Sequence, residues 1–515
     1  MDPSVARPSA SELTLTELLR RSAVRVPTAP AFQLADDSRS YGAFYGRAES
    51  LASALKTRGV QAGDRVAVWM HNSIEMLESI FAIQMLGAAA VPINFRLRTE
   101  EVTFILNDVE AVGAIVDQEL FSEYSDALTL PWLLIYSGDS DSSFEDAIRS
   151  GATDGPALDV VVDDRMPAFV MYTSGTTGRP KGAVLSHRNL MANTWNWTFE
   201  VAIERGDIYL SGFPLFHIGG LVGLYPFLAM GALSVLQSSG GFDPQTSLDL
   251  QKRSGATICA YVPAQWQLIV DQSQARDCLS GSRRALWGAS PASSALLEKM
   301  GETLPPMTII STFGQTEISA NATFLGTADA QRKQGSVGRL VQTLEHRIVD
   351  EDDQDVAIGE VGEIVYRGPT VMAGYHNRPE ANAESFRGGW FHSGDLVRED
   401  EEGYVYVIER KDDMIISGAE NVYPAEIEGV LGDHPAIRES AVVGIADPKW
   451  GQTPVAYVVR NPDADITEEQ IISYLEGRLA SYKKPSQVVF IDELPRNASG
   501  KILKRLLRES SKKES

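Results

Sequence analysis

Apolar residues along the first half of the chain alternate between two periods, one helical and one typical of buried strands. Segment 41–58 has apolar positions at helical spacing and stops at Gly59, whereas segment 64–69 is a short and almost continuous apolar run. The elements predicted in this way are helices over 41–58 and 73–85 and strands over 64–69 and 88–92, and a similar rhythm returns over 191–238 and 248–310. Regular alternation of helix and strand predicts layered α/β structure with largely parallel sheets.

The pattern starts afresh after Arg410 and predicts a second, smaller α/β unit. Pro424 suits the first turn of a helix over 424–430, and Thr467 with Gln470 forms a capping box for a helix over 468–479. Strands are predicted over 440–445, 454–459 and 487–491. Further upstream, the glycine-rich segment 151–156 is interpreted as a turn-rich linker.

Length and charge narrow the functions that this chain can have. A chain of 515 residues is too long for one core, so at least two domains are expected. The net charge of −23 argues against a nucleic-acid partner, whose phosphates need clustered lysine and arginine. Cys259 and Cys278 match no metal or redox spacing and indicate a reducing compartment. Residues 1–12 have no apolar core, so no secretory signal is expected and the protein is predicted to be cytoplasmic.

One uncharged segment, 218–236, is long enough to cross a membrane. It contains four glycines and the central Pro226, and no cluster of lysine or arginine brackets it. We therefore expect no membrane span here, but a helix followed by a buried strand over 232–236.

A loop rich in hydrogen-bond donors lies between two apolar strands, one over 167–172 and one beginning at Ala183. Glycines let the backbone of such a loop curl around an anion, and hydroxyls and an ammonium add further donors. The loop residues are Thr173, Ser174, Gly175, Thr176, Thr177, Gly178 and Lys181. The sequence therefore predicts a polyphosphate site, although the Walker A spacing is absent and the loop leads into a strand.

This stretch resembles the phosphate-loop signature of the adenylate-forming superfamily, which includes acyl-CoA synthetases, luciferase-like enzymes and the adenylation domains of peptide synthetases. Motifs similar to those of the superfamily follow in the same order over 311–317, 374–380, 389–395, 409–426 and 494–501. The resemblance implies a large N-terminal domain of layered α/β subdomains over 1–411. It also implies a small mobile C-terminal domain over 412–515, with Asp412 as the pivot.

The resemblance assigns nucleotide roles to residues far apart in the chain. The expected ATP and AMP contacts, besides the loop, are Gly288, Ala289, Ser290, Thr312, Phe313, Gly314, Gln315, Thr316, Asp395, Arg410 and Lys501. Phe313 offers a face to adenine, Asp395 and Arg410 contact the ribose, and Glu317 binds Mg²⁺. The catalytic residues implied are Lys501, which bridges the substrate carboxylate and the α-phosphate, with Thr173, Lys181, Glu317 and His217.

Plain structural interpretations remain open for three of these motifs. Thr316 and Glu317 also suit the N-terminus of a helix, where a carboxylate is favourable. Segment 409–413 could be a solvated linker. Lys501 could join Lys504 on the solvated face of a terminal helix.

The expected activity is an ATP-dependent, AMP-forming acyl-CoA synthetase that acts on a fatty or aryl acid, with ATP, Mg²⁺ and coenzyme A. The implied acyl pocket contains His217, Gly220, Trp287 and Thr312, and the implied thiol tunnel contains Gly418, Ala419 and Asn421. Peptide-synthetase domains have an aspartate where this chain has His217, so amino acids are poor candidates. Two alternatives are an enzyme that loads a carrier protein and a nucleotide-binding pseudoenzyme. A homodimer and the orientation of Trp287, into the pocket or into the core, stay open.

Overall fold

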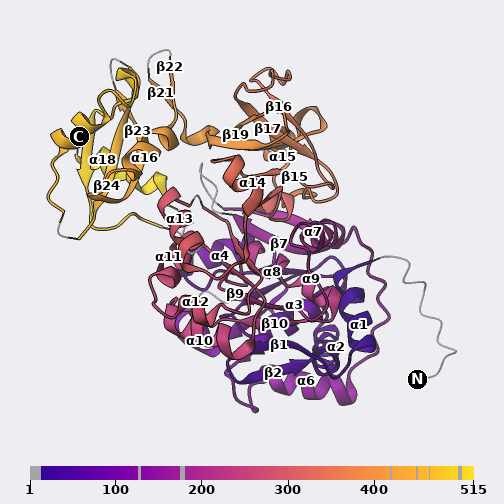
Figure 1. The fold of residues 1–515 in the computed structure, drawn as a ribbon. Coiled ribbons are helices and arrows are strands. Elements are labelled where there is room, and N and C mark those ends of the chain that lie inside the picture. Colours follow the sequence, from indigo (N-terminus) through magenta and orange to yellow (C-terminus); the bar gives the residue numbers. More distant parts are fainter. Residues whose placement is uncertain are drawn as a thin grey trace. The chain divides into compact units, whose positions relative to one another are not determined.

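The computed structural model describes residues 13–125, 129–173, 180–290, 292–417, 420–447, 450–462, 464–496 and 502–514. They belong to two compact units, which Figure 1 shows as ribbons. The first unit is formed within Met1–Asp329, Val341–Glu345 and Arg367–Glu384, and the second within Ala330–Leu340, His346–Tyr366 and Ser385–Ser515. This division groups segment 385–411 with the C-terminal residues, and the functional boundary at Asp412 stays a prediction.

The first unit contains a seven-stranded sheet in the order β18-β8-β7-β4-β3-β5-β6. Its strands are β3 (Arg65–Trp69), β4 (Ala89–Pro92), β5 (Gly113–Asp117), β6 (Leu133–Tyr136), β7 (Pro167–Thr173), β8 (Lys181–Ser186) and β18 (Gly374–Tyr375). Strands β3 to β7 run parallel, whereas β8 is antiparallel to both β7 and β18. Apolar residues of helix α4 (Thr99–Asp108), such as Val102 and Ile105, pack against Trp69 and Val116 on one face.

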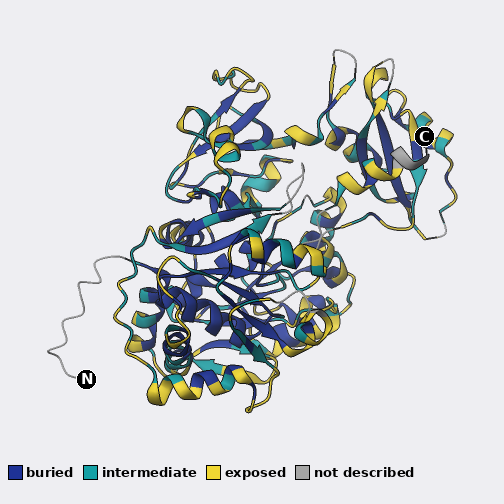
Figure 2. Cartoon of the chain, turned by 180° about the vertical axis from the view of Figure 1, so that it is seen from behind, coloured by how far each residue is buried: buried dark blue, intermediate teal, exposed yellow. Residues whose placement is uncertain are grey.

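A second sheet of this unit runs in the order β14-β13-β12-β11-β9-β10-β1-β2. Its strands are β1 (Pro30–Leu34), β2 (Asp37–Ser40), β9 (Ile208–Ser211), β10 (Leu233–Leu236), β11 (Ile258–Tyr261), β12 (Arg284–Trp287), β13 (Thr308–Phe313) and β14 (Thr323–Gly326). Its core packs under α10 (Pro244–Ser254), α11 (Pro263–Val270), α12 (Ala275–Cys278) and α13 (Ser294–Thr303). Every residue of β4, β5 and β11 is buried, and Figure 2 shows the interior of this unit in dark blue.

The predicted fold class is confirmed, and most predicted elements lie within a residue or two of their expected bounds. Examples are α2 (Tyr41–Thr57) and α3 (Ile74–Met85), the latter capped by the Ser73 side chain, which accepts a hydrogen bond from the Met76 N–H. The uncharged segment 218–236 forms α8 (Ile218–Val222), α9 (Tyr225–Met230) and β10. Within the described ranges, no helix is long and apolar enough to cross a membrane.

The second unit has two further sheets. One has the order β16-β17-β19-β20, and the other has β22-β21-β24-β23, with β25 paired to β24. The strands of these two sheets are β16 (Glu345–Val349), β17 (Gly362–Arg367), β19 (Phe391–Glu399), β20 (Val405–Arg410), β21 (Ile415–Ser417), β22 (Glu420–Val422), β23 (Ile437–Asp447), β24 (Gly451–Arg460) and β25 (Gln487–Phe490). The short strand β15 (Arg339–Leu340) belongs to neither sheet. The predicted capping box is present on α17 (Glu468–Leu475), which ends four residues earlier than expected.

The other helices of the chain connect these sheets or pack on them. They are α1 (Leu15–Arg25), α5 (Gln118–Tyr124), α6 (Ser143–Asp154), α7 (His187–Glu200), α14 (Thr327–Arg332), α15 (Pro379–Ser385), α16 (Pro424–Gly432) and α18 (Lys504–Glu514).

The predicted linker over 151–156 is partly wrong, because α6 continues through Gly151 to Asp154. A Cβ at Gly151 would lie 1.9 Å from the backbone oxygen of Ser50, and one at Gly155 would lie 2.2 Å from the Ser53 hydroxyl. Both glycines therefore let α6 pack closely against α2, and only Gly155 follows the end of the helix. Sequence composition alone does not separate close packing from a turn.

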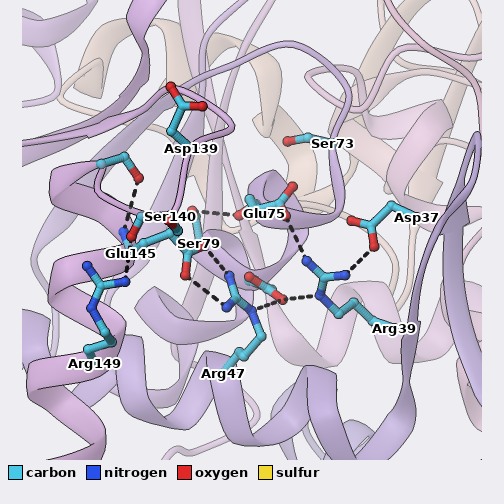
Figure 3. A network of polar contacts seen from close by, with 12 residues as sticks. Asp37, Arg39, Arg47, Ser73, Glu75, Ser79, Asp139, Ser140, Glu145 and Arg149 are labelled. Atoms are coloured by element: carbon cyan, nitrogen blue, oxygen red, sulfur yellow. Dashed lines mark hydrogen bonds and ion pairs between the residues drawn. The ribbon is translucent and has the colours of Figure 1, made fainter.

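A buried network of charges joins α2, α3, α6 and β2 (Figure 3). Arg47 lies 2.7 Å from Glu78 and 2.6 Å from Glu145, and Arg39 lies 3.2 Å from Glu75. The Glu78 side chain has no exposed surface. Burial raises the pKa of Glu78 to about 7, although the guanidinium of Arg47 opposes the shift.

Candidate functional site

The two residues that flank the phosphate loop face each other at the end of a β-hairpin. Thr173 ends β7, Lys181 begins β8, and the two are paired across the hairpin. The Thr173 hydroxyl donates to the Lys181 carbonyl over 3.4 Å. The predicted loop residues Ser174, Gly175, Thr176, Thr177 and Gly178 lie outside the described residues.

The segment expected to lie beside adenine follows the carboxyl end of β12, next to β13. Parallel pairing sets Trp287 opposite Ser311, so Gly288, Ala289 and Ser290 pass beside Thr312. A Cβ at Gly288 would lie 2.4 Å from the Thr312 hydroxyl oxygen, so only glycine fits here. Ligands of α/β sheets bind beyond the carboxyl ends of the strands, and this segment has that position.

The second nucleotide motif turns sharply after β13. A Cβ at Gly314 would lie 2.1 Å from the Ala320 carbonyl oxygen, and Glu317 lies in the short 3₁₀ helix Thr316–Ile318. Gln315, and not Thr316, is the residue before this helix. Phe313, Gln315 and Thr316 are half-buried, whereas the Glu317 side chain is almost fully buried.

Glu317 is held by the segment that contains β18. The Tyr375 hydroxyl donates to Glu317 Oε1 over 2.9 Å, and the Met372 N–H donates to the Glu317 carbonyl over 2.8 Å. The Lys181 ammonium lies 5.2 Å from the centroid of the Tyr375 ring. The first unit thus brings Thr173, Lys181 and Glu317 together. A buried carboxylate beside the donors expected to hold phosphate fits Mg²⁺, which takes one or two protein carboxylates and completes its shell with phosphate oxygens and water.

Sequence reasoning missed the supports of this site. Tyr375 lies in the motif over 374–380, to which the sequence assigned no function. Asp108, at the end of α4, accepts hydrogen bonds from the Tyr172 hydroxyl, over 2.6 Å, and from the Arg378 guanidinium. Asn189 on α7 donates to the carbonyls of Pro369 and Val371 over 2.7 and 2.8 Å.

The sequence contained a signal for the hydrogen bonds that Asn189 makes. Asn189, Asn193 and Asn196 recur at helical spacing and lie along one face of α7. All three are buried. Buried amides at helical spacing point to backbone groups that need hydrogen-bond partners.

His217 of the predicted acyl pocket begins the turn into α8, beyond the carboxyl end of β9. Burial lowers its pKa to about 4, so the imidazole is neutral at pH 7. Nearby, Phe216 lies edge-on to Phe95 at 5.5 Å between centroids, and His71 lies 4.5 Å from Phe95. Asp117 accepts a hydrogen bond from His71 over 2.8 Å, and this bond raises the pKa of the imidazole.

Two other residues of the predicted acyl pocket have clear packing roles. A Cβ at Gly220 would lie 2.3 Å from the Pro214 carbonyl oxygen, so this position needs glycine to close the turn. Trp287 packs against the core cluster that includes Ala285, Tyr261 and Trp266. Trp287 is itself half-buried, and its place in the acyl pocket stays a prediction.

The remaining predicted residues belong to the second unit. Asp395 on β19 and Arg410 on β20 are opposite each other, with Arg410 Nε 2.7 Å from Asp395 Oδ1, and Asp395 is buried. Asp412 lies in the exposed 3₁₀ turn Lys411–Asp413, and Asn421 is exposed on β22. Gly418, Ala419 and Lys501 lie outside the described residues.

Comparison with known proteins agrees with these assignments of fold. The AMP-binding enzyme family matches residues 19–376, and the AMP-binding enzyme C-terminal domain matches residues 426–501. The chain is 38% identical over 504 residues to indoleacetate–CoA ligase from Aromatoleum aromaticum, and the match covers 96% of this chain and 98% of the relative.

Solved structures of the o-succinylbenzoate coenzyme A synthetase from Bacillus subtilis are also similar. The complex with the acyl-adenylate intermediate has a TM-score of 0.85 at 31% identity and covers 95% of this chain and 97% of that one. The complex with ATP and a magnesium ion has a TM-score of 0.84 at 31% identity and covers 95% and 98%. The chain therefore belongs to the AMP-binding enzyme family of the adenylate-forming superfamily, and it is an AMP-forming acid–thiol ligase.

Proposed function

We propose that this enzyme activates an aryl or arylacetic acid with ATP and Mg²⁺ and transfers the acyl group to coenzyme A. The observation that carries the proposal is the match over nearly the whole chain to a ligase that acts on indoleacetate. It refines the prediction of a fatty or aryl acid. In the first half-reaction the carboxylate attacks the α-phosphate and pyrophosphate leaves. In the second the thiol attacks the acyl carbon of the acyl-adenylate, and AMP leaves.

Residues of the first unit supply most of the nucleotide chemistry. Thr173 and Lys181 hold the pyrophosphate part of ATP, and Glu317 is the carboxylate that would bind Mg²⁺. When bound, the metal offsets the negative charge that builds up on the leaving group. Little covalent chemistry is asked of the protein in phosphoryl transfer, so catalysis rests on positioning and charge.

The second unit contributes the ribose contacts, the bridging lysine and the path of the thiol. Asp395 and Arg410 are already oriented by their own ion pair, which fixes the carboxylate for the ribose hydroxyls. Lys501 bridges acid and α-phosphate, Gly418, Ala419 and Asn421 line the path of the thiol, and Asp412 is the pivot between residues 1–411 and 412–515. These roles are carried over from the family motifs, residue by residue.

Aromatic rings near His217 support a planar substrate. His71, Phe95 and Phe216 come from loops after strands of both sheets and form one row of contacts. A flat aryl group packs against such rings with offset-stacked or edge-to-face geometry. The neutral imidazole of His217 offers no charge to a substrate ammonium or to a second carboxylate.

Two further points complete the proposal. ATP and coenzyme A are cytoplasmic metabolites, and we place the enzyme in that compartment. We keep the homodimer as a proposal, to be tested by light scattering after gel filtration.

A screen of pyrophosphate release over aryl, arylacetic and straight-chain acids, with and without coenzyme A, tests the activity. We expect the highest kcat/KM with an aryl or arylacetic acid, and consumption of coenzyme A with the same acid. Adenylate formation without thioester would favour the carrier-protein alternative. ATP binding without pyrophosphate release from any acid would favour a pseudoenzyme.

The variant Phe95→Leu tests the aromatic row. It removes one flat face, so kcat/KM should fall more for the aryl acid than for a straight-chain acid, by about two- to tenfold, the worth of one aromatic pair. Phe44→Leu is the matched control, because Phe44 packs between Phe32 and Phe81 in a buried cluster. An equal fall for both acids in Phe95→Leu would refute the pocket assignment.

A further inference from the structure

Tyr375 connects two groups of the nucleotide site that come from distant parts of the chain. Its hydroxyl donates to Glu317 Oε1 over 2.9 Å. The face of its ring is 5.2 Å from the Lys181 ammonium, measured to the ring centroid. One side chain therefore contacts both the carboxylate expected to bind Mg²⁺ and the lysine at the end of the phosphate loop.

The backbone around Tyr375 is fixed on both sides. Antiparallel pairing sets Tyr375 opposite Ala183 on β8, and the next N–H, from His376, donates to the Gly182 carbonyl over 2.8 Å. On the other side, Met372 is bonded to the Glu317 carbonyl. The backbone around Tyr375 is thus hydrogen-bonded both to the strand that follows the phosphate loop and to the turn that contains Glu317.

Two buried side chains hold the segment before Tyr375 in place. Asn189 donates to two carbonyls of segment 369–371, and Ser319, two residues after Glu317, donates through its hydroxyl to the Thr370 carbonyl over 2.9 Å. Segment 369–376 and the Glu317 turn therefore form one rigid hydrogen-bonded piece. A side chain carried by such a piece can hold another in a defined orientation.

We propose that Tyr375 is a positioning residue for Mg²⁺-bound ATP, an inference that rests on the proposed role of Glu317. Its hydroxyl fixes the plane of the Glu317 carboxylate, so that the metal meets an oriented ligand. Its ring holds the Lys181 ammonium by cation–π attraction. This attraction limits the orientations of the Lys181 side chain, so less side-chain entropy is lost when the ammonium meets a phosphate.

Two variants separate the hydroxyl from the ring. Tyr375→Phe keeps the ring and removes the bond to Glu317, and Tyr375→Leu removes both. The measurement is equilibrium binding of ATP at increasing Mg²⁺, of ATP with no metal, and of AMP, all without any acid. We expect Tyr375→Phe to weaken Mg²⁺-dependent ATP binding by about tenfold, the worth of a hydrogen bond to a charged acceptor. Metal-free ATP and AMP should bind as to the original protein.

Tyr375→Leu should also weaken metal-free ATP binding, by about two- to fivefold, because the Lys181 contact is lost. Tyr41→Phe is the matched control, since its hydroxyl donates to the Ala232 carbonyl over 2.7 Å inside the core. This control should lower the melting temperature and leave every binding constant unchanged.

Two results would overturn the proposal. One is Mg²⁺-dependent ATP binding that is unchanged in Tyr375→Phe. The other is an equal loss for Mg²⁺–ATP, metal-free ATP and AMP, which indicates a purely structural role. No acid enters this assay, so a failure of the proposed aryl substrate would leave its outcome standing.

Discussion

Replacing Arg47 by methionine should lower the free energy of unfolding of the first unit by about 3–5 kcal/mol at pH 8, because it leaves a charged carboxylate buried without its partner. Glu78 has no exposed surface and lies 2.7 Å from Arg47, whose guanidinium also donates to both oxygens of Glu145. Arg39 is the nearest other cation, 3.7 Å from Glu78, and Glu75 adds a like charge. Methionine retains the apolar stem of arginine, so the loss of stability results from the missing charge and not from a cavity.

The loss should also depend on pH in a defined direction. The pKa of Glu78 is raised from 4.5 to about 7 in the folded protein, so the folded state binds this proton more tightly than the unfolded state. The contribution of Glu78 to stability is therefore largest below pH 4.5 and falls as pH rises toward 7. Without Arg47 the pKa rises further, so the stability difference between the variant and the original protein should be larger at pH 8 than at pH 5.5.

Urea unfolding followed by fluorescence at both pH values measures this difference. The double variant Arg47→Met, Glu78→Gln should recover most of the loss, since no buried charge remains. Arg21→Met is the control: the Arg21 side chain is exposed and Glu17 keeps Arg20 as a partner, so this i,i+4 pair is worth about 0.5 kcal/mol or less. A loss that is the same at both pH values, or a double variant no more stable than the single one, would refute the reasoning.

Three further predictions concern single residues. Lys501→Ala should slow acyl-adenylate formation by about 100-fold or more, the effect of a preorganised charge on a developing anion. It should spare thioester formation from supplied acyl-adenylate, and unchanged pyrophosphate release would remove Lys501 from the mechanism. Trp287→Gly should lower stability by up to about 3 kcal/mol and leave the order of preferred acids unchanged, because the half-buried Trp287 packs against a core cluster; a shift toward longer acids in a chain-length series would instead place it in the pocket. Gly151→Val should destabilise the protein by at least about 1–3 kcal/mol, since its side chain would meet the Ser50 carbonyl oxygen; an unchanged melting curve would restore the linker interpretation.

Local sequence patterns predicted the elements well wherever a single physical cause decides the structure. The apolar run of β3 and the helical period of α3 act over a few residues, and the structure has both within one residue of their expected bounds. The glycine at position 151 was misinterpreted, because the sequence does not distinguish a glycine needed for close packing from one needed for a turn. The neighbour that decides between them, Ser50, is about a hundred residues away in the chain.

The same distinction explains what was missed at the site. Thr173, Lys181 and Glu317 were predicted because donors and carboxylates in ordered motifs reveal their chemistry in the sequence. Tyr375 could not be assigned, since a tyrosine next to glycine has no chemistry of its own until β18 pairs with β8 and places it beside Glu317. That pairing joins segments almost two hundred residues apart, and no local periodicity of the sequence indicates it. The residues proposed to perform the reaction were therefore predicted from motifs, whereas those proposed to orient them depend on contacts formed only in the folded chain.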